Sequence, residues 1–526
     1  MLNESILSLI VFLPLAGALV LAVLPAKGKL IPWAALLVTL ATFVLTLHLP
    51  VHYDYAASGF QFEANHSWIA NPNIRYHLGV DGLSMWLVVL TGFLAPFGVL
   101  ISWKTITHRT KEFYVLFLLQ QTAMLGVFVS LDLFLYYAFW EMTLVPMTLL
   151  IGIFGRTANR VRAALKFFLY AFIPSALLLV GMVWVYAKTG TFDFPALHHL
   201  ALTHGISANA PALFLASLAF VFAFAVKVPV FPLHGWLGDA VSEAPTAAVM
   251  VLAGKLGLYS ILRFSLGIFP EQSREIAPVM IALAVIGILY GSLVALVQSD
   301  LKRLAAFATV AQLSFITLGI FGFTVIGIDG AVFQLLSESI SGAALFMLLG
   351  LLYERYGTYG MAEYGGVASK LPWVATMFVV TTLALIGLPL LNGFTGEFLI
   401  LAGTFKAHTG WTSVAALGVI LSAGFMLRML LKVFYGVDGP KTAAVAAPDM
   451  SGREHIALWP FLALMLVMGV HSSLWLHAID PAAVALANAP SQTTGQNAAA
   501  LAPVAQPLPS KMLLPKSSQL VAGGAR

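Results

Sequence analysis

The sequence predicts an all-α polytopic membrane protein with about fourteen transmembrane helices. Only 9% of its 526 residues are charged and 60% are hydrophobic, so the chain lacks the polar surface that a soluble enzyme of this length needs. Its mean hydropathy is +0.92. Apolar runs of about twenty residues, long enough to cross ~30 Å of hydrocarbon as a helix, follow one another almost to the end of the chain.

Windows of about nineteen residues divide the apolar sequence into fourteen predicted spans. We expect the first span to be retained, because it lacks the basic segment and the small-residue cleavage site of a signal peptide. From about residue 480 the composition changes to Ala, Pro, Gln, Ser and Thr, which predicts a mobile tail. The predicted spans are 4–24, 30–50, 78–102, 113–131, 133–154, 164–187, 211–235, 244–262, 277–298, 304–325, 331–353, 372–402, 411–431 and 456–478.

Basic residues are distributed unevenly between alternate loops. By the positive-inside rule, the richer set of loops is expected to be cytoplasmic, which places both termini on the periplasmic side of a bacterial inner membrane. The richer set holds Lys27, Lys29, Lys104, Arg109, Lys111, Arg156, Arg160, Arg162, Lys302, Arg303, Arg355, Lys370, Lys432, Lys441 and Arg453, and the poorer set holds Arg75, Lys188, Arg263, Arg274 and Lys406.

Five ionisable side chains fall deep inside predicted spans, where an unpaired charge costs ~2.5–3.5 kcal/mol. Such groups are expected to face one another or water, and they are usually functional. We therefore take them as candidates for a proton relay. They are Glu141, Lys227, Lys255, Glu338 and Glu397.

Lys227 lies beside two prolines in the segment KVPVFPLHGW. Pro229 and Pro232 lack the amide donors that would bond the carbonyls of Ala225 and Val228, so this span should be broken and should line a hydrated cavity. Burial lowers the proton affinity of a lysine, and an opposed carboxylate restores it. A pair with Glu141, about nine residues inside its span, would therefore act as a switch. The alternative is a static structural ion pair.

The second half of the chain carries three of the candidates. Glu338 shares a helical face with Gln334, Ser337 and Ser341, which could hold a file of water near Lys255.

Glu397 follows the broken segment GLPLLNGFTG, in which Pro389 frees the carbonyl of Leu385. It is expected to be hydrated there, or else to point into bulk solvent at a helix end. Lys166 and His234 are supporting candidates near the first site. His234 has no metal-ligand spacing around it, and such a histidine is more often a rim or relay residue than a ligand.

The sequence gives no indication of a cofactor or metal site. It has no Cys, so it cannot hold an iron–sulfur cluster by thiolates, and it has no HExxH, GxGxxG or GxxxxGK[ST] motif. The net charge of +5 reports membrane topology rather than nucleic-acid binding.

Six segments together resemble the antiporter-like membrane subunits of respiratory complex I, and most of all the chain M (subunit 4) group. The similarity covers roughly residues 70–440. The segments are YHLGVDGLSMWLVVLT (76–91), FWEMTLVPMTLLIGIFG (139–155), ALKFFLY (164–170), KVPVFPLHGWLGDAVSEAPT (227–246), QSDLKRLAAF (298–307) and GLPLLNGFTGEFLI (387–400).

The resemblance implies two inverted five-helix repeats, each with a Pro/Gly-broken helix, and proton translocation driven by quinone reduction in partner subunits. It matches Glu141 and Lys227 to the essential Glu–Lys pair, Lys255 to the central Lys and Glu397 to the distal acidic residue. FMN, iron–sulfur clusters and quinone are then expected in other subunits. The implied parts are 1–110 (three N-terminal helices), 111–263 (first repeat), 276–436 (second repeat), 437–479 (C-terminal helix) and 480–526 (tail).

The chain departs from the family in the centre of this relay. Where relatives commonly carry QMxSHG it reads QLLSES, which puts Glu338 at the position of a histidine, and where they have AYSSVSHMG it reads AFATVAQLSF. The chain is therefore identified as a divergent or paralogous member. Two other functions stay open: a subunit of a multi-subunit Na⁺/H⁺ antiporter or membrane-bound hydrogenase, and a scaffold whose relay has decayed.

Overall fold

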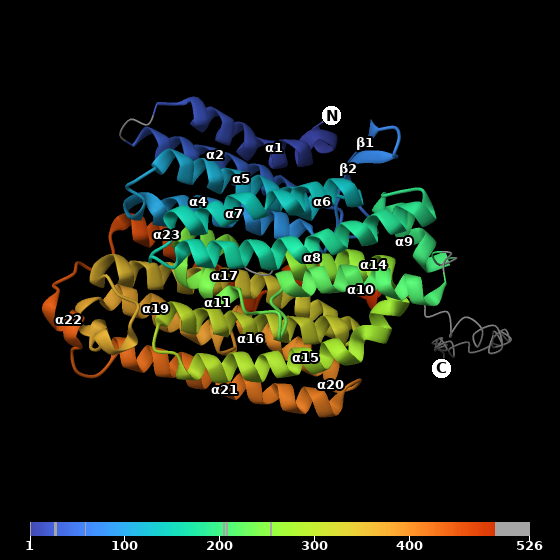
Figure 1. Cartoon of the computed structure of the whole chain (residues 1–526). Coiled ribbons are helices and arrows are strands. Elements are labelled where there is room, and N and C mark those ends of the chain that lie inside the picture. The colour runs from blue at the N-terminus through green and yellow to red at the C-terminus, as the bar shows by residue number, and fades with distance from the viewer. Residues whose placement is uncertain are drawn as a thin grey trace, which may run out of the picture. The chain divides into compact units, whose positions relative to one another are not determined.

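The computed structural model describes residues 2–25, 29–57, 59–203, 206, 209–252 and 255–489, all within the unit Met1–Ala489. In these residues thirteen helical stretches are long and apolar enough to cross a membrane, which confirms the predicted class. They run side by side along a common direction (Figure 1). They consist of α1 (Leu2–Val23), α2 (Leu30–Thr46) with α3 (His48–His52), α4 (Met85–Thr105), α5 (Thr110–Val129), α6 (Leu133–Met142) with α7 (Leu144–Phe154), α8 (Arg160–Thr189), α10 (Ala210–Lys227), α12 (Thr246–Leu252) with α13 (Lys255–Ser260), a π-helical turn (Ile261–Ser265) and α14 (Leu266–Ile268), α15 (Pro270–Val297), α16 (Leu301–Phe321), α17 (Val325–Tyr356), α21 (Thr409–Phe434) and α23 (Gly452–Val470).

Both predicted helix breaks are present. The helix α10 ends at Lys227, and α11 (Leu237–Glu243) begins only after the segment that contains Pro229 and Pro232. The predicted span 372–402 is two helices of fourteen residues each, α19 (Pro372–Leu385) and α20 (Asn392–Phe405), with Pro389 between them. Neither half is long enough to span a bilayer alone, so a fourteenth crossing stays a prediction.

Several elements were not predicted from the sequence. Two antiparallel strands, β1 (Gln61–Ile69) and β2 (Ile74–Val80), form a hairpin between the second and third long helices. The helix α24 (Ser473–Ala487) crosses the predicted start of the mobile tail, so that prediction is wrong for residues 480–487. The rest of the predicted tail, from 490, lies outside the described residues. The remaining short helices are α9 (Phe194–Thr203), a 3₁₀ turn (Met361–Glu363), α18 (Val367–Lys370) and α22 (Pro440–Ala444).

The connecting segments gather at two opposite ends of the helices. We call one the basic end; it holds segments 155–159, 298–300, 357–371 and 435–451, which are joined by the contacts Arg156–Asp300, Leu301–Tyr359 and Lys370–Asp438. We call the other the hairpin end; it holds the β1–β2 hairpin, segment 190–193 and α9 (Figure 1). The described loops of the richer basic set thus lie at one end, as expected if successive helices run in opposite directions. Lys27 lies outside the described residues.

Two basic residues that we predicted to be in loops are buried in helices instead. Arg263 lies in the π-helical turn, 4% exposed, and donates two hydrogen bonds to Asp81, one of 2.8 Å from Nη1. Lys302 lies in the first turn of α16 and is also 4% exposed. Hydropathy alone misplaced both, because a cation with a tertiary partner can enter a helix end that a window average excludes.

One hydrogen-bonding pattern occurs twice. Segments 131–133 and 192–194 exchange two backbone hydrogen bonds of 2.8 and 2.7 Å, and segments 299–301 and 359–361 exchange two of 2.8 Å. In each case an Asp caps the following helix, and two aromatic rings stack 4.4 to 4.6 Å apart. The capping residues are Asp132 and Asp300, and the stacked pairs are Tyr186–Phe192 and Tyr353–Tyr359.

Candidate functional site

Glu141 lies in α6 and is contacted by a side chain of α8. Asp132 caps the start of α6 by accepting from the amides of Phe134 and Leu135, which fixes the helix that carries Glu141. From the neighbouring helix α8, the hydroxyl of Ser175 donates to the Glu141 carboxylate. Ser175 is 1% exposed and Glu141 is half-buried, so this contact is only partly shielded.

Lys227 ends α10 and points at the α6–α7 junction. Its Nζ donates to Thr143 Oγ1 at 3.1 Å and lies 5.0 Å from the ring centroid of Trp140 and 5.8 Å from that of Phe167. It interacts electrostatically with Glu141, but these two described residues form no ion pair within 4 Å. The predicted switch pair is thus open in this conformation, in which a hydroxyl and two aromatic faces hold the ammonium, and the switch itself stays a prediction.

The backbone beside the first break has protein partners. The amide of Val230 donates to the carbonyl of Ala225 at 2.9 Å, and Trp236 Nε1 donates to that of Val226 at 2.9 Å. Of the water or protein partners that the freed carbonyl of Ala225 was predicted to need, the structure supplies a protein one, the amide of Val230, one residue beyond Pro229. The predicted hydrated cavity beside this break stays a prediction.

The two supporting candidates lie apart from this pair. His234 packs between Phe231 and Tyr290, with ring centroids 5.5 and 4.9 Å away, and its buried Nδ1 has no hydrogen-bond partner among the described residues. Lys166 forms an ion pair of 2.6 Å with Asp239, in which both side chains are about one-third exposed.

Lys255 begins α13 and is 2% exposed. Its Nζ donates to the carbonyl of Met250 at 3.1 Å. A cavity of about 20 Å³ is lined by Lys255, Thr309 and Glu338, which is room for about one water molecule. The structure thus brings the two predicted central residues to one cavity without direct contact.

Glu338 lies in α17, 7% exposed, and one of its oxygens, Oε2, has no hydrogen-bond partner among the described residues. It interacts electrostatically with both Lys255 and Glu397 and lies within hydrogen-bonding reach of Thr309. A second cavity, of about 10 Å³, extends from Glu338 and Thr309 to Gln312. Glu338 therefore lies between the two other charged groups of the predicted relay.

Glu397 is fixed in a buried network. Gln312 Nε2 donates to Glu397 Oε1 at 2.8 Å, and Gln334 Nε2 donates to Gln312 Oε1 at 3.2 Å. Gly387 has φ +73°, and a Cβ there would lie 2.8 Å from Glu397 Oε2, so the second break needs glycine at this point. Because Glu397 is 4% exposed, the alternative that it points into bulk solvent is wrong.

Sequence reasoning did not assign roles to the neutral residues that contact the charged ones. Each is a neutral polar side chain in a largely apolar segment, which a search for intramembrane charges alone does not find. They are Thr143, Ser175, Thr309 and Gln312.

The site combines carboxyl and amine groups, which can take up and release protons, with hydroxyl and amide groups that hydrogen-bond to them. Among the described residues no group of three or more His, Asp or Glu side chains is placed to hold a metal ion.

Comparisons with known proteins identify the family of the chain. Residues 130–422 match the family described as NADH:quinone oxidoreductase/Mrp antiporter, TM. NADH-quinone oxidoreductase subunit M of Rhodobacter capsulatus is 42% identical over 499 residues, which cover 91% of this chain and 95% of that protein.

A chain of respiratory complex I from Thermus thermophilus with bound NADH superposes with a TM-score of 0.83 at 29% identity, over 91% of this chain and 99% of that one. A chain of the Mrp complex from Dietzia sp. DQ12-45-1b shares the fold, with a TM-score of 0.80 at 22% identity over 93% and 98% of the two chains. The chain therefore belongs to the NADH:quinone oxidoreductase/Mrp antiporter transmembrane family, as a homologue of subunit M.

Proposed function

We propose that the chain is a proton-translocating, antiporter-like subunit of a complex I-type NADH-quinone oxidoreductase. The observation that carries this proposal is the environment of Lys227, an ammonium 9% exposed at the end of a broken helix, with a neutral hydroxyl as its hydrogen-bond partner. Buried lysines of this kind are the basic side chains that exchange protons. The family membership supports the same function.

The proposed switch is a movement of Glu141 relative to Lys227. While Ser175 holds the carboxylate, Lys227 lacks a contacting counter-charge. When the carboxylate reaches Lys227, the ammonium is stabilised; when it withdraws, the proton can move on toward Lys255.

In the second half, the proton would pass from the cavity at Lys255 to Glu338 and then to Glu397. Gln312 holds Glu397 and borders the cavity at Glu338, so it positions the acceptor of this last transfer. The carboxyl that receives the proton forms an O–H bond as the donor loses one, and no electron moves.

The energy for this transport is proposed to come from partner subunits. Moving one charge against the membrane potential costs ~2.3 kcal/mol per 100 mV. The chain has no Cys to ligate a redox centre, so we assign FMN, iron–sulfur clusters and quinone to other subunits of the assembly and none to this chain.

We further propose that the basic end faces the cytoplasm of a bacterium and that both termini are periplasmic. Segments 111–263 and 276–436 are then two inverted repeats, flanked by 1–110 and 437–479. The hydrogen-bonding pattern that occurs at 131–133 and again at 299–301 supports this division, because it lies once at each end.

The substitution Lys227→Ala tests the proposal. It is expected to abolish NADH-driven proton pumping in membrane vesicles, at least tenfold, while the chain still assembles on native gels. Lys406→Ala, which removes an exposed lysine, is the matched control and should pump normally. Normal pumping by an assembled Lys227→Ala variant would end the proposal.

A further inference from the structure

We propose that Lys302 takes up protons at the basic end and passes them to the cavity at Glu338. This inference rests on the proposed function and assigns a residue that the relay described above does not use. It concerns only where protons come into the second half of the chain.

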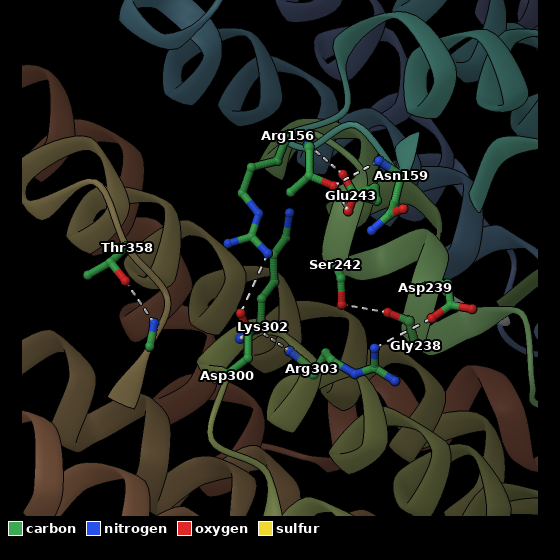
Figure 2. Close-up of polar contacts among 12 residues, drawn as sticks. Arg156, Asn159, Gly238, Asp239, Ser242, Glu243, Asp300, Lys302, Arg303 and Thr358 are labelled. Carbon is green, nitrogen blue, oxygen red and sulfur yellow. Dashed lines mark hydrogen bonds and ion pairs between the residues drawn. The ribbon is translucent and has the colours of Figure 1, made fainter. Parts of the chain in front are cut away.

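Lys302 is buried among polar groups at the start of α16 (Figure 2). Its Nζ donates to the backbone carbonyl of Ala244, directly after α11, and lies 5.5 Å from the ring centroid of Tyr359. No carboxylate oxygen of the described residues lies within 4 Å of this Nζ. The ammonium thus has a neutral partner, as Lys227 has.

The nearby carboxylates are engaged elsewhere. Glu243 accepts from the amide and the hydroxyl of Thr157, at 2.7 and 2.6 Å. Asp300 accepts from the amides of Lys302 and Arg303 and pairs with Arg156 at 3.5 Å. Lys302 interacts electrostatically with both acids but forms a contact ion pair with neither, so its ammonium is not locked to a carboxylate.

Solvent reaches the immediate neighbours of Lys302. The side chains of Arg156 and Asp300 are 26% and 25% exposed, and that of Arg303 is 44% exposed. Figure 2 shows these groups around the buried ammonium. A proton from water at the basic end therefore has only a short way to Lys302.

The inner side of α16 leads from Lys302 to the relay. Positions 302, 305, 309 and 312 recur at helical spacing on one face. Ala305, Thr309 and Gln312 line the 10 Å³ cavity beside Glu338. With a rise of ~1.5 Å per residue, Ala305 lies ~4.5 Å and Thr309 ~10.5 Å along the helix from Lys302.

The transfer is a simple exchange of protons. An N–H bond of the Lys302 ammonium breaks and its proton passes through water in the cavity to the Glu338 carboxylate, where an O–H bond forms. The neutral amine then takes a proton from water at the basic end. The Ala244 carbonyl holds the side chain in place throughout.

Lys302→Arg is the decisive test, because a guanidinium keeps the charge and the donors but does not release its proton. We expect the assembled Lys302→Arg variant to lose at least fivefold in protons pumped per NADH oxidised, measured in inverted vesicles, with Lys302→Met equally impaired. Arg303→Gln, which changes the exposed neighbour, should pump normally. Normal pumping by Lys302→Arg would overturn the inference and leave Lys302 a structural clamp.

If Lys302→Arg does not assemble, Lys302→His and Lys302→Gln provide the test. Histidine exchanges protons and glutamine does not. Better pumping by Lys302→His supports the inference, and equal pumping by both contradicts it. Lys227→Ala, measured alongside, separates the two proposals. If Lys227→Ala loses pumping while Lys302→Arg pumps normally, only this inference is refuted. If Lys227→Ala pumps normally, the proposed function itself is refuted.

Discussion

Glu338 shows how one substitution can change the chemistry of a relay while the surrounding framework stays. A histidine at this position, as the resembling family carries, can donate and accept at once, whereas a carboxylate only accepts until it is protonated. In this chain, Glu338 Oε2 is buried and has no hydrogen-bond partner among the described residues. Glu338 and Thr309 both line the two central cavities.

The substitution Glu338→Gln should therefore impair transport. Glutamine keeps the size and hydrogen-bonding capacity of the side chain but cannot take up a proton. We expect at least a fivefold loss of pumping per NADH oxidised in vesicles, with normal assembly. Ser314→Ala in α16 is the control, since its hydroxyl donates to its own helix, to the carbonyl of Val310, and Ser314 is not among the residues that line the two cavities. Unchanged pumping in Glu338→Gln would remove Glu338 from the relay.

The charged residues could be found from the sequence because an ionisable group in an apolar span stands out. All five candidates lie in described helices or at the ends of such helices. Their mutual contacts could not be predicted, because these depend on neutral side chains. Lys227 donates to Thr143, and Gln312 donates to Glu397 while lining a cavity that Glu338 also lines.

At the scale of elements, the two breaks followed directly from proline and glycine chemistry. The hairpin and α24 did not, since each is shorter than the run of about twenty apolar residues that a search for spans detects. Their positions are set by tertiary contacts, such as the bond from Arg274 to the carbonyl of Ala487.

The buried pair Arg263–Asp81 joins the π-helical turn to the segment before α4. Removing Asp81 would leave the guanidinium buried without its counter-charge, which typically costs ~3–5 kcal/mol. Asp81→Ala should therefore markedly lower the temperature at which the chain aggregates in heated membrane extracts. Glu112→Ala breaks the exposed pair with Arg109, in which the side chains are 57% and 47% exposed, and should have little effect. Equal behaviour of the two variants would contradict this prediction.

His77 gives the hairpin a pH dependence. Although burial opposes its charged form, hydrogen bonds to Asp193 (2.6 Å) and Glu63 (2.9 Å) raise the pKa of His77 above 6.5. The stabilisation is then complete below pH 6.5 and is lost as the pH rises through the raised folded-state pKa. Hydrogen exchange of strands 61–80, corrected for intrinsic rates, should quicken over that range. In His77→Gln this pH dependence should be absent; its persistence would assign it to another group.

At the scale of the whole molecule, the described helices form a site that spans both halves of the chain but contains no group for driving it. We therefore expect the chain to copurify with quinone-site and iron–sulfur subunits from solubilised membranes, and its vesicle transport to require NADH oxidation and not Na⁺. Copurification with antiporter subunits alone, together with Na⁺-dependent transport, would instead favour the alternative function, a subunit of a Na⁺/H⁺ antiporter. The Mrp complex has a chain with the same fold. A scaffold role predicts neither form of transport.

The small size of the two central cavities has a consequence for energy conservation. Volumes of about 20 and 10 Å³ leave room for about one water molecule each beside Lys255, Glu338 and Gln312. A protein that stores work as an ion gradient must not let it leak back between turnovers. We therefore expect the tightly packed centre of the chain to insulate against proton leakage, and conduction to require the helices to part briefly.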